Sequence, residues 1–162
     1  MRLIRGGELK ELVDSVVIGS TLPVGVNELD IRLGKQYWVE RELSYSQRVH
    51  VMKPEDWQGH LQSAYIPEHG MSLLPQHFML VEAKEQFVMP EYVMGLLTLR
   101  SWAAKSGLEQ SSSLTLKPGW KGPLILELFN SLQHNELFIT PGLPVAQVQF
   151  FDINRSKCRH YE

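Results

Sequence analysis

Short apolar segments separated by turn-forming residues dominate the second half of this 162-residue sequence and restrict what the chain can fold into. The clearest segment, residues 124–129, follows a turn at 117–122 that contains one proline and two glycines. Further segments of this kind lie at residues 73–82, 85–90, 93–99, 113–116 and 145–151. Many short strands between breakers are typical of β-sandwiches and β-barrels, so the sequence predicts an all-β fold.

The first half of the sequence predicts one helix and one long strand. Residues 7–13 carry apolar side chains at helical spacing. In residues 27–34 apolar and charged side chains alternate, which is the pattern of a half-buried strand, and residues 37–39 are expected to continue the same sheet. Residues 40–70 are mixed and polar, so we expect irregular strands and a long excursion there.

Composition limits the class of protein. With 43% hydrophobic and 21% charged residues, the sequence is typical of a globular domain, and we expect one domain over residues 1–162. The net charge of -2 gives no reason to expect a nucleic-acid partner. Cys158 is the single cysteine, which excludes an internal disulfide and fits a reducing compartment. The sequence has no apolar run long enough to span a bilayer and no signal-peptide core, so we expect a cytoplasmic protein with no membrane partner.

Residues 100–108 combine a basic residue, hydroxyls and small side chains directly after a predicted strand. As one short helical turn they would bury Ala103, Ala104 and Leu108 and place Ser101 and Lys105 on a shared face. Hydroxyl, ammonium and backbone N–H groups directed at one spot suit an anion such as a phosphate. A short helix with solvated ends explains the same pattern.

Glu127 interrupts the apolar strand predicted at 124–129. Its neighbours Leu126 and Leu128 point to the opposite face, so the carboxylate is either an exposed-face residue or a buried base. Burial would make it a better proton acceptor near neutral pH.

Zinc-binding patterns are incomplete. His134-Asn135-Glu136 matches the first half of a zinc deaminase signature, but the second half needs two cysteines that the sequence lacks. The six histidines show no zinc-ligand spacing either, so we expect no metal site built by the protein alone.

Several short motifs, in order, resemble the dCTP deaminase family of the dUTPase-like superfamily. They are residues 29–34 (LDIRLG), 100–101 (RS), 107–108 (GL), 118–122 (PGWKG), 126–130 (LELFN), 141–142 (PG), 146–147 (AQ) and Phe150. The resemblance implies a distorted dUTPase-like β-barrel (β-clip) that forms a homotrimer with active sites shared between subunits. It also implies a deoxynucleotide triphosphate substrate bound with Mg²⁺, and deamination without zinc.

The same resemblance assigns roles to individual residues. Glu127 falls on the family's catalytic glutamate, which activates the water that attacks C4 of cytosine. Ser101 falls on a serine that helps to position that water and the phosphates. The further candidates for binding the nucleotide or its phosphates are Arg100, Lys105, Ser113, Lys117 and Gln147.

Three positions depart from the family pattern. Lys105 replaces an arginine and so loses the bidentate fork for phosphate, and Trp102 stands where a small serine is usual. Lys117 replaces the aspartate that holds the deoxyribose 3′-hydroxyl, and it would act on Glu127 electrostatically if the two lie within several ångströms of each other.

Two classes of function therefore remain open. The first is an enzyme that converts dCTP to dUTP and ammonia. The second is a nucleotide-binding or assembly protein with weakened catalysis, which is favoured by Lys117 and by the short tail that carries Arg155, Lys157 and Arg159. A dUTP pyrophosphatase is a third alternative, although the aspartate that its chemistry needs is replaced.

Overall fold

The computed structural model of the chain describes residues 1–19, 23–42, 44–46, 49, 59–111 and 114–153. Ser113 and the basic residues of the C-terminal tail lie outside the described residues. The elements are β1 (Arg2–Leu3), α1 (Gly6–Val16), β2 (Val17–Ile18), β3 (Leu29–Glu40), β4 (Leu61–Tyr65), β5 (Met71–Leu73), β6 (Phe78–Val88), β7 (Val93–Leu99), α2 (Ser101–Lys105), β8 (Leu108–Gln110), β9 (Thr115–Leu116), β10 (Lys121–Asn130), β11 (Leu137–Ile139) and β12 (Pro144–Asp152).

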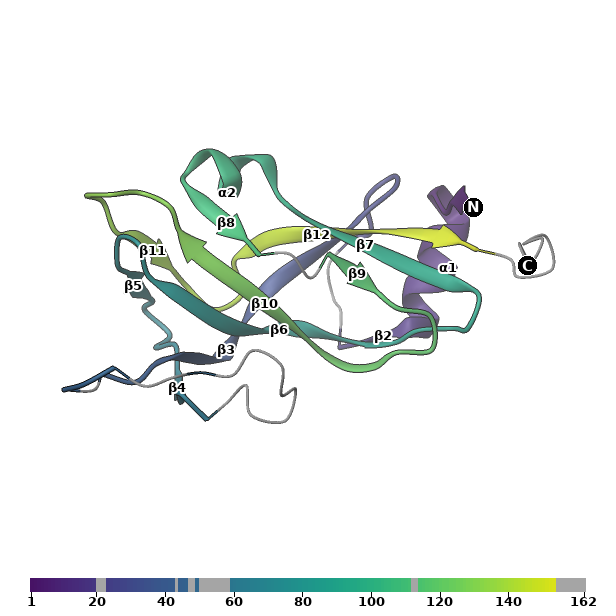
Figure 1. The fold of residues 1–162 in the computed structure, drawn as a ribbon. Helices are drawn as coiled ribbons and strands as arrows, with labels where there is room; N and C mark the ends of the chain where they lie inside the picture. Colours follow the sequence, from purple (N-terminus) through teal and green to yellow (C-terminus); the bar gives the residue numbers. More distant parts are fainter. Residues whose placement is uncertain (20–22, 43, 47–48, 50–58, 112–113, 154–162) are drawn as a thin grey trace, which may run out of the picture.

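Ten of these strands form one antiparallel sheet that curls into a distorted barrel (Figure 1). Its main path runs β8-β10-β6-β3-β12-β7-β9, while β1 pairs with β12, β2 with β6 and β4 with β3. The short strands β5 and β11 form a separate pair. The prediction of an all-β fold is confirmed.

Strand β3 joins the two halves of the barrel. Its first residues pair with β12, where Ile31 lies opposite Ala146, and its later residues pair with β6, where Tyr37 lies opposite Val81. The expected strands at 27–34 and 37–39 are therefore one strand that continues through Gly34.

The core lies inside the curl and is filled by side chains that alternate along the strands. Phe87 of β6 and Phe150 of β12 are fully buried, and their ring centroids are 6.4 Å apart. Helix α1, predicted at 7–13, closes one end of the barrel with Leu9, Val13 and Val16 buried (Figure 1). Because this helix is amphipathic, its exposed face carries the charged residues.

The prediction of two strands at 73–82 and 85–90 is wrong, because β6 is a single strand over Phe78–Val88. The strand continues through Ala83 and Lys84, the two residues left between the predicted segments, and it places the carboxylate of Glu85 at a core position. Glu85 is fully buried, and its Oε1 accepts a hydrogen bond from Nε of Arg32 at 2.7 Å. Its Oε2 accepts the backbone N–H of Arg32 at 2.8 Å. The Glu85 carboxylate therefore accepts two hydrogen bonds from Arg32 of β3. Arg32 lies close to the point where the pairing of β3 changes from β12 to β6.

Three other predicted strands are confirmed. The segments 93–99, 124–129 and 145–151 are β7, β10 and β12, with small shifts at their ends. No helix among the described residues is long and apolar enough to cross a membrane.

Candidate functional site

Helix α2 presents two of the predicted site residues on the surface. Ser101 and Lys105 are exposed and stand one turn apart at the two ends of this five-residue helix. Ala103 and Leu108 are buried as predicted, whereas Ala104 is exposed. With one buried residue of its own, α2 has little apolar contact to hold it in place.

Arg100 and Gln147, both predicted to bind the nucleotide, lie together at the beginning of α2. Nη2 of Arg100 donates to Oδ2 of Asp30 at 2.7 Å and lies 2.6 Å from Oδ1, while Nη1 donates to Oε1 of Gln147 at 3.2 Å. Both ionic side chains are partly exposed, at 32% for Arg100 and 22% for Asp30. The guanidinium thus ties the end of β7 to β3 and β12.

Glu127 lies in β10 between β6 and β8. Leu80 of β6 is its cross-strand partner, and its carbonyl oxygen accepts the backbone N–H of Ser111 at 2.8 Å. Leu126 and Leu128 are fully buried, so the Glu127 side chain points away from the core. The Glu127 side chain is half-buried in the single chain. Its exposure therefore lies between the two alternatives that the sequence left open, an exposed-face residue and a buried base. Among the described residues, no hydrogen bond or ion pair joins its side chain to Ser101.

Lys117 lies at the other end of the molecule. It is exposed in the turn between β9 and β10, where its carbonyl accepts the N–H of Trp120 at 3.1 Å. Six residues of β10 separate this turn from Glu127, a distance of about 20 Å at the rise of a β-strand. Within one chain Lys117 therefore lies too far from Glu127 to act on it directly (Figure 1).

The same separation holds along β7. Leu116, next to Lys117, pairs with Gly95 near the beginning of β7, whereas Ser101 follows its end. The predicted site residues are thus separated within one chain. One end of the barrel carries Arg100, Ser101, Lys105 and Gln147, and the other end carries Lys117.

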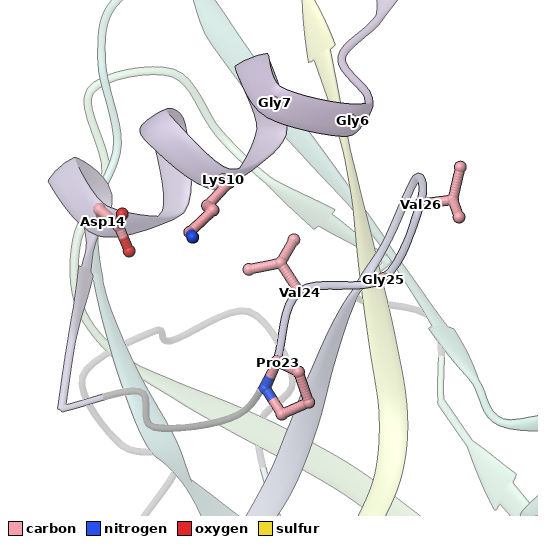
Figure 2. Close-up of a pocket in the computed structure, with 8 residues that line it drawn as sticks. All are labelled: Gly6, Gly7, Lys10, Asp14, Pro23, Val24, Gly25 and Val26. Carbon is pink, nitrogen blue, oxygen red and sulfur yellow. The ribbon is translucent and has the colours of Figure 1, made fainter.

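Two hollows of the described surface are lined by other residues. One, of about 600 Å³, lies between α1 and the loop at 23–26, where Lys10 and Asp14 face Val24 (Figure 2). The other, of about 940 Å³, lies between β3, β4 and β5. In the described part of the chain, no group of three or more His, Cys, Asp or Glu side chains could hold a metal ion.

Sequence reasoning missed three residues that organise this end of the barrel. Asp30 pairs with Arg100, which is 70 residues away in the chain. Ser131 bonds to the Gly107 carbonyl in the turn that follows α2, and the neighbouring Asn130 bonds to the Asn135 carbonyl beyond β10. Asp30 and Asn130 stand in motifs of the family resemblance, but nothing local indicated their partners.

Comparison with known proteins supports the expected fold. The family model described as dCTP deaminase-like matches residues 3–153. The dCTP deaminase of Buchnera aphidicola subsp. Baizongia pistaciae is 29% identical over 163 residues, covering 94% of this chain and 81% of that protein. The dUMP-forming dCTP deaminase of Nanoarchaeum equitans is 27% identical over 173 residues, covering 94% of this chain and 85% of that protein.

A solved structure agrees with the family match. The crystal structure of 2′-deoxycytidine 5′-triphosphate deaminase from Agrobacterium tumefaciens superposes with a TM-score of 0.72 at 17% identity. The match covers 92% of this chain and 48% of that chain, so this chain spans about half the length of the solved protein.

Proposed function

Because the chain belongs to the dCTP deaminase-like family, we propose that it deaminates dCTP by hydrolysis to dUTP and ammonia. One observation carries this proposal. Glu127, at the position that resembles the family's catalytic glutamate, is half-buried in an otherwise apolar strand, with its side chain pointing away from the core. A carboxylate there can reach a bound ligand and still be partly shielded from water, as a general base requires.

The reaction assigns Glu127 two proton transfers. It takes a proton from water as the oxygen bonds to C4 of cytosine, forming a tetrahedral centre. It passes that proton to N3 of the ring, then takes the proton of the new C4 hydroxyl and gives it to the departing 4-amino group as the C4–N bond breaks, which leaves the C4 carbonyl of uracil. The products are dUTP and ammonia, so one carboxyl group acts first as base and then as acid. Ser101 helps to position the water and the phosphates.

The triphosphate would lie over α2. Ser101 and Lys105 offer a hydroxyl and an ammonium on the exposed surface, and Arg100 and Gln147 border them. We also propose that Ser113 binds the nucleotide or its phosphates. We expect Mg²⁺ to be held mainly by phosphate oxygens, because the described residues do not form a carboxylate cluster for it, and we expect no zinc.

In this proposal a neighbouring subunit would supply Lys117 to the site. The turn that holds Lys117 lies about 20 Å along β10 from Glu127 of the same chain, so we infer that a site containing both residues needs another copy. A homotrimer, with the 117–120 turn of one subunit beside the α2 end of the next, satisfies this requirement.

The test is turnover of dCTP with Mg²⁺ by the wild-type chain and by Glu127→Gln. A glutamine keeps the shape but cannot take a proton, so we expect ammonia release to fall by about 10²-fold or more while the Kd for dCTP changes little. Glu109→Gln is the matched control, because Glu109 is an exposed carboxylate on the adjacent strand β8, opposite Phe129, and should leave turnover unchanged. Chromatography of the products separates dUTP from dUMP, since a relative is named dUMP-forming.

The outcomes separate the two classes of function. Undiminished ammonia release by Glu127→Gln would remove Glu127 from the mechanism. Binding of dCTP without ammonia release by the wild-type chain would favour a nucleotide-binding or assembly protein, the alternative that Lys117 supports.

A further inference from the structure

The turn that follows α2 is fastened to the end of the strand that carries Glu127. Ser131, directly after β10, donates two hydrogen bonds to the carbonyl oxygen of Gly107, from its hydroxyl at 2.8 Å and from its backbone N–H at 3.0 Å. Gly107 has a φ of +90°, and a Cβ at this position would lie 2.6 Å from the Leu132 side chain. A glycine is therefore required for this close approach.

The segment 130–132 is itself rigidly held. Asn130 is fully buried, and its Nδ2 donates to the carbonyls of Leu73 and Asn135, both at 2.9 Å. Its Oδ1 accepts the N–H of Leu132 at 3.0 Å. Nε2 of Gln76 donates to the carbonyls of Ser131 and Leu132 at 2.9 and 3.1 Å. A network in which each member is paired specifies one arrangement of the chain.

Helix α2 is thus clamped at both ends. Arg100 holds its beginning through Asp30 and Gln147, and Ser131 holds the turn after it through Gly107. Between these anchors α2 buries only Ala103, so the anchors decide where its exposed side chains stand. Because Ser131 is four residues beyond Glu127, the second anchor ties α2 to the strand of the proposed base.

We propose that Ser131 is a positioning residue, whose hydroxyl sets α2, with Ser101 and Lys105, relative to Glu127. This inference rests on the proposed function. Without the hydroxyl, α2 would sample more positions in the free protein. Binding of the nucleotide would then have to order α2, and this cost would lower the affinity for the nucleotide. Once the nucleotide is bound, α2 would be in place again, so the rate of the chemical step would change less than the affinity.

The test compares Ser131→Ala, Ser131→Thr and a matched control. Ser131→Ala should raise the KM and the Kd for dCTP about fivefold, the effect of one lost hydrogen bond, and change kcat by less than about twofold. Ser131→Thr keeps the hydroxyl and should restore both constants. Ser15→Ala removes the same type of bond, from Ser15 Oγ to the Leu12 carbonyl at 2.7 Å on α1, and should change neither constant.

Amide hydrogen exchange gives a readout that does not depend on activity. Exchange in residues 101–110 should be faster in Ser131→Ala and as slow as in the wild-type chain in Ser131→Thr. If the alanine variant does not fold, Ser131→Cys replaces it, because a thiol is a weak donor of similar size.

The results distinguish this inference from the proposed function. If the wild-type chain binds dCTP but releases no ammonia, the proposed deaminase activity fails, and the Kd and exchange comparisons still decide the role of Ser131. Unchanged exchange in Ser131→Ala would overturn the clamp. Faster exchange with an unchanged Kd would overturn the positioning role, because a purely structural contact gives that result. A wild-type chain that binds no nucleotide would overturn both proposals.

Discussion

At the scale of single residues, buried charge in this protein is paired across long sequence distances. Glu85 and Arg32 are 53 residues apart in the chain, and their side chains are 0% and 9% exposed. A buried ion pair contributes little net stability compared with apolar side chains, because both charges lose their hydration. Removing one partner is costly, since the other charge stays buried without compensation.

Glu85→Ala should lower the free energy of unfolding by about 3–5 kcal/mol, because Arg32 would lose its carboxylate partner inside the barrel. Urea denaturation measures the change. Glu68→Ala is the control, because Glu68 pairs with Lys35 on the surface, where the two side chains are 78% and 60% exposed, and its removal should leave stability unchanged. Equal effects of the two substitutions would show that the Glu85 pair is not buried in solution.

At the scale of elements, β3 determines how the two halves of the barrel meet. The strand shifts register against β6 between Leu33 and Tyr37, and Gly34 stands in that interval. A Cβ at Gly34 would lie 2.4 Å from the carbonyl oxygen of Glu82 on β6. The two backbones can approach this closely because residue 34 has no side chain.

The same glycine-to-alanine substitution should therefore have opposite signs in β3 and α1. Gly34→Ala should destabilise the fold by about 1–3 kcal/mol, since its methyl group meets backbone that cannot rotate away. Gly7→Ala should stabilise it by about 0.5–1 kcal/mol, because Gly7 lies in a helix with open space around it. Urea midpoints of the two variants test this, and a stable Gly34→Ala protein would contradict the close approach.

At the scale of the whole molecule, the barrel holds Lys117 apart from the predicted site residues around α2. The turn with Lys117 lies at the α1 end of β7, and α2 follows the other end of that strand (Figure 1). A rigid, hydrogen-bonded sheet cannot fold back to join them. In the homotrimer proposed above, Lys117 would act in a site that it shares with a neighbouring subunit.

Lys117→Asp should raise kcat/KM for dCTP by about tenfold, because a carboxylate at this position can accept a hydrogen bond from the deoxyribose 3′-hydroxyl. Steady-state assays of ammonia release measure the change, with circular dichroism as the check of folding. Lys121→Asp makes the same change of charge four residues away, on an exposed residue at the beginning of β10, and should give no gain. Equal gains in both variants, or none in Lys117→Asp, would show that Lys117 does not limit this site.

The sequence by itself determined most of the strands, helix α1, a turn that the structure ends at Trp120, and the family resemblance. These features depend on local alternation, on breakers and on short motifs, all of which are readable along the chain. The tertiary structure alone decided the pairing of Arg100 with Asp30, the hold of Ser131 on Gly107 and the continuity of β6 through Glu85.

The physical reason is the range of the interactions. Local patterns report which face of a segment is apolar, but a charged or hydroxyl side chain carries no signal of a partner that lies dozens of residues away. The separation of Lys117 from Glu127 likewise follows from strand register, which is fixed only when the barrel closes and its core is packed.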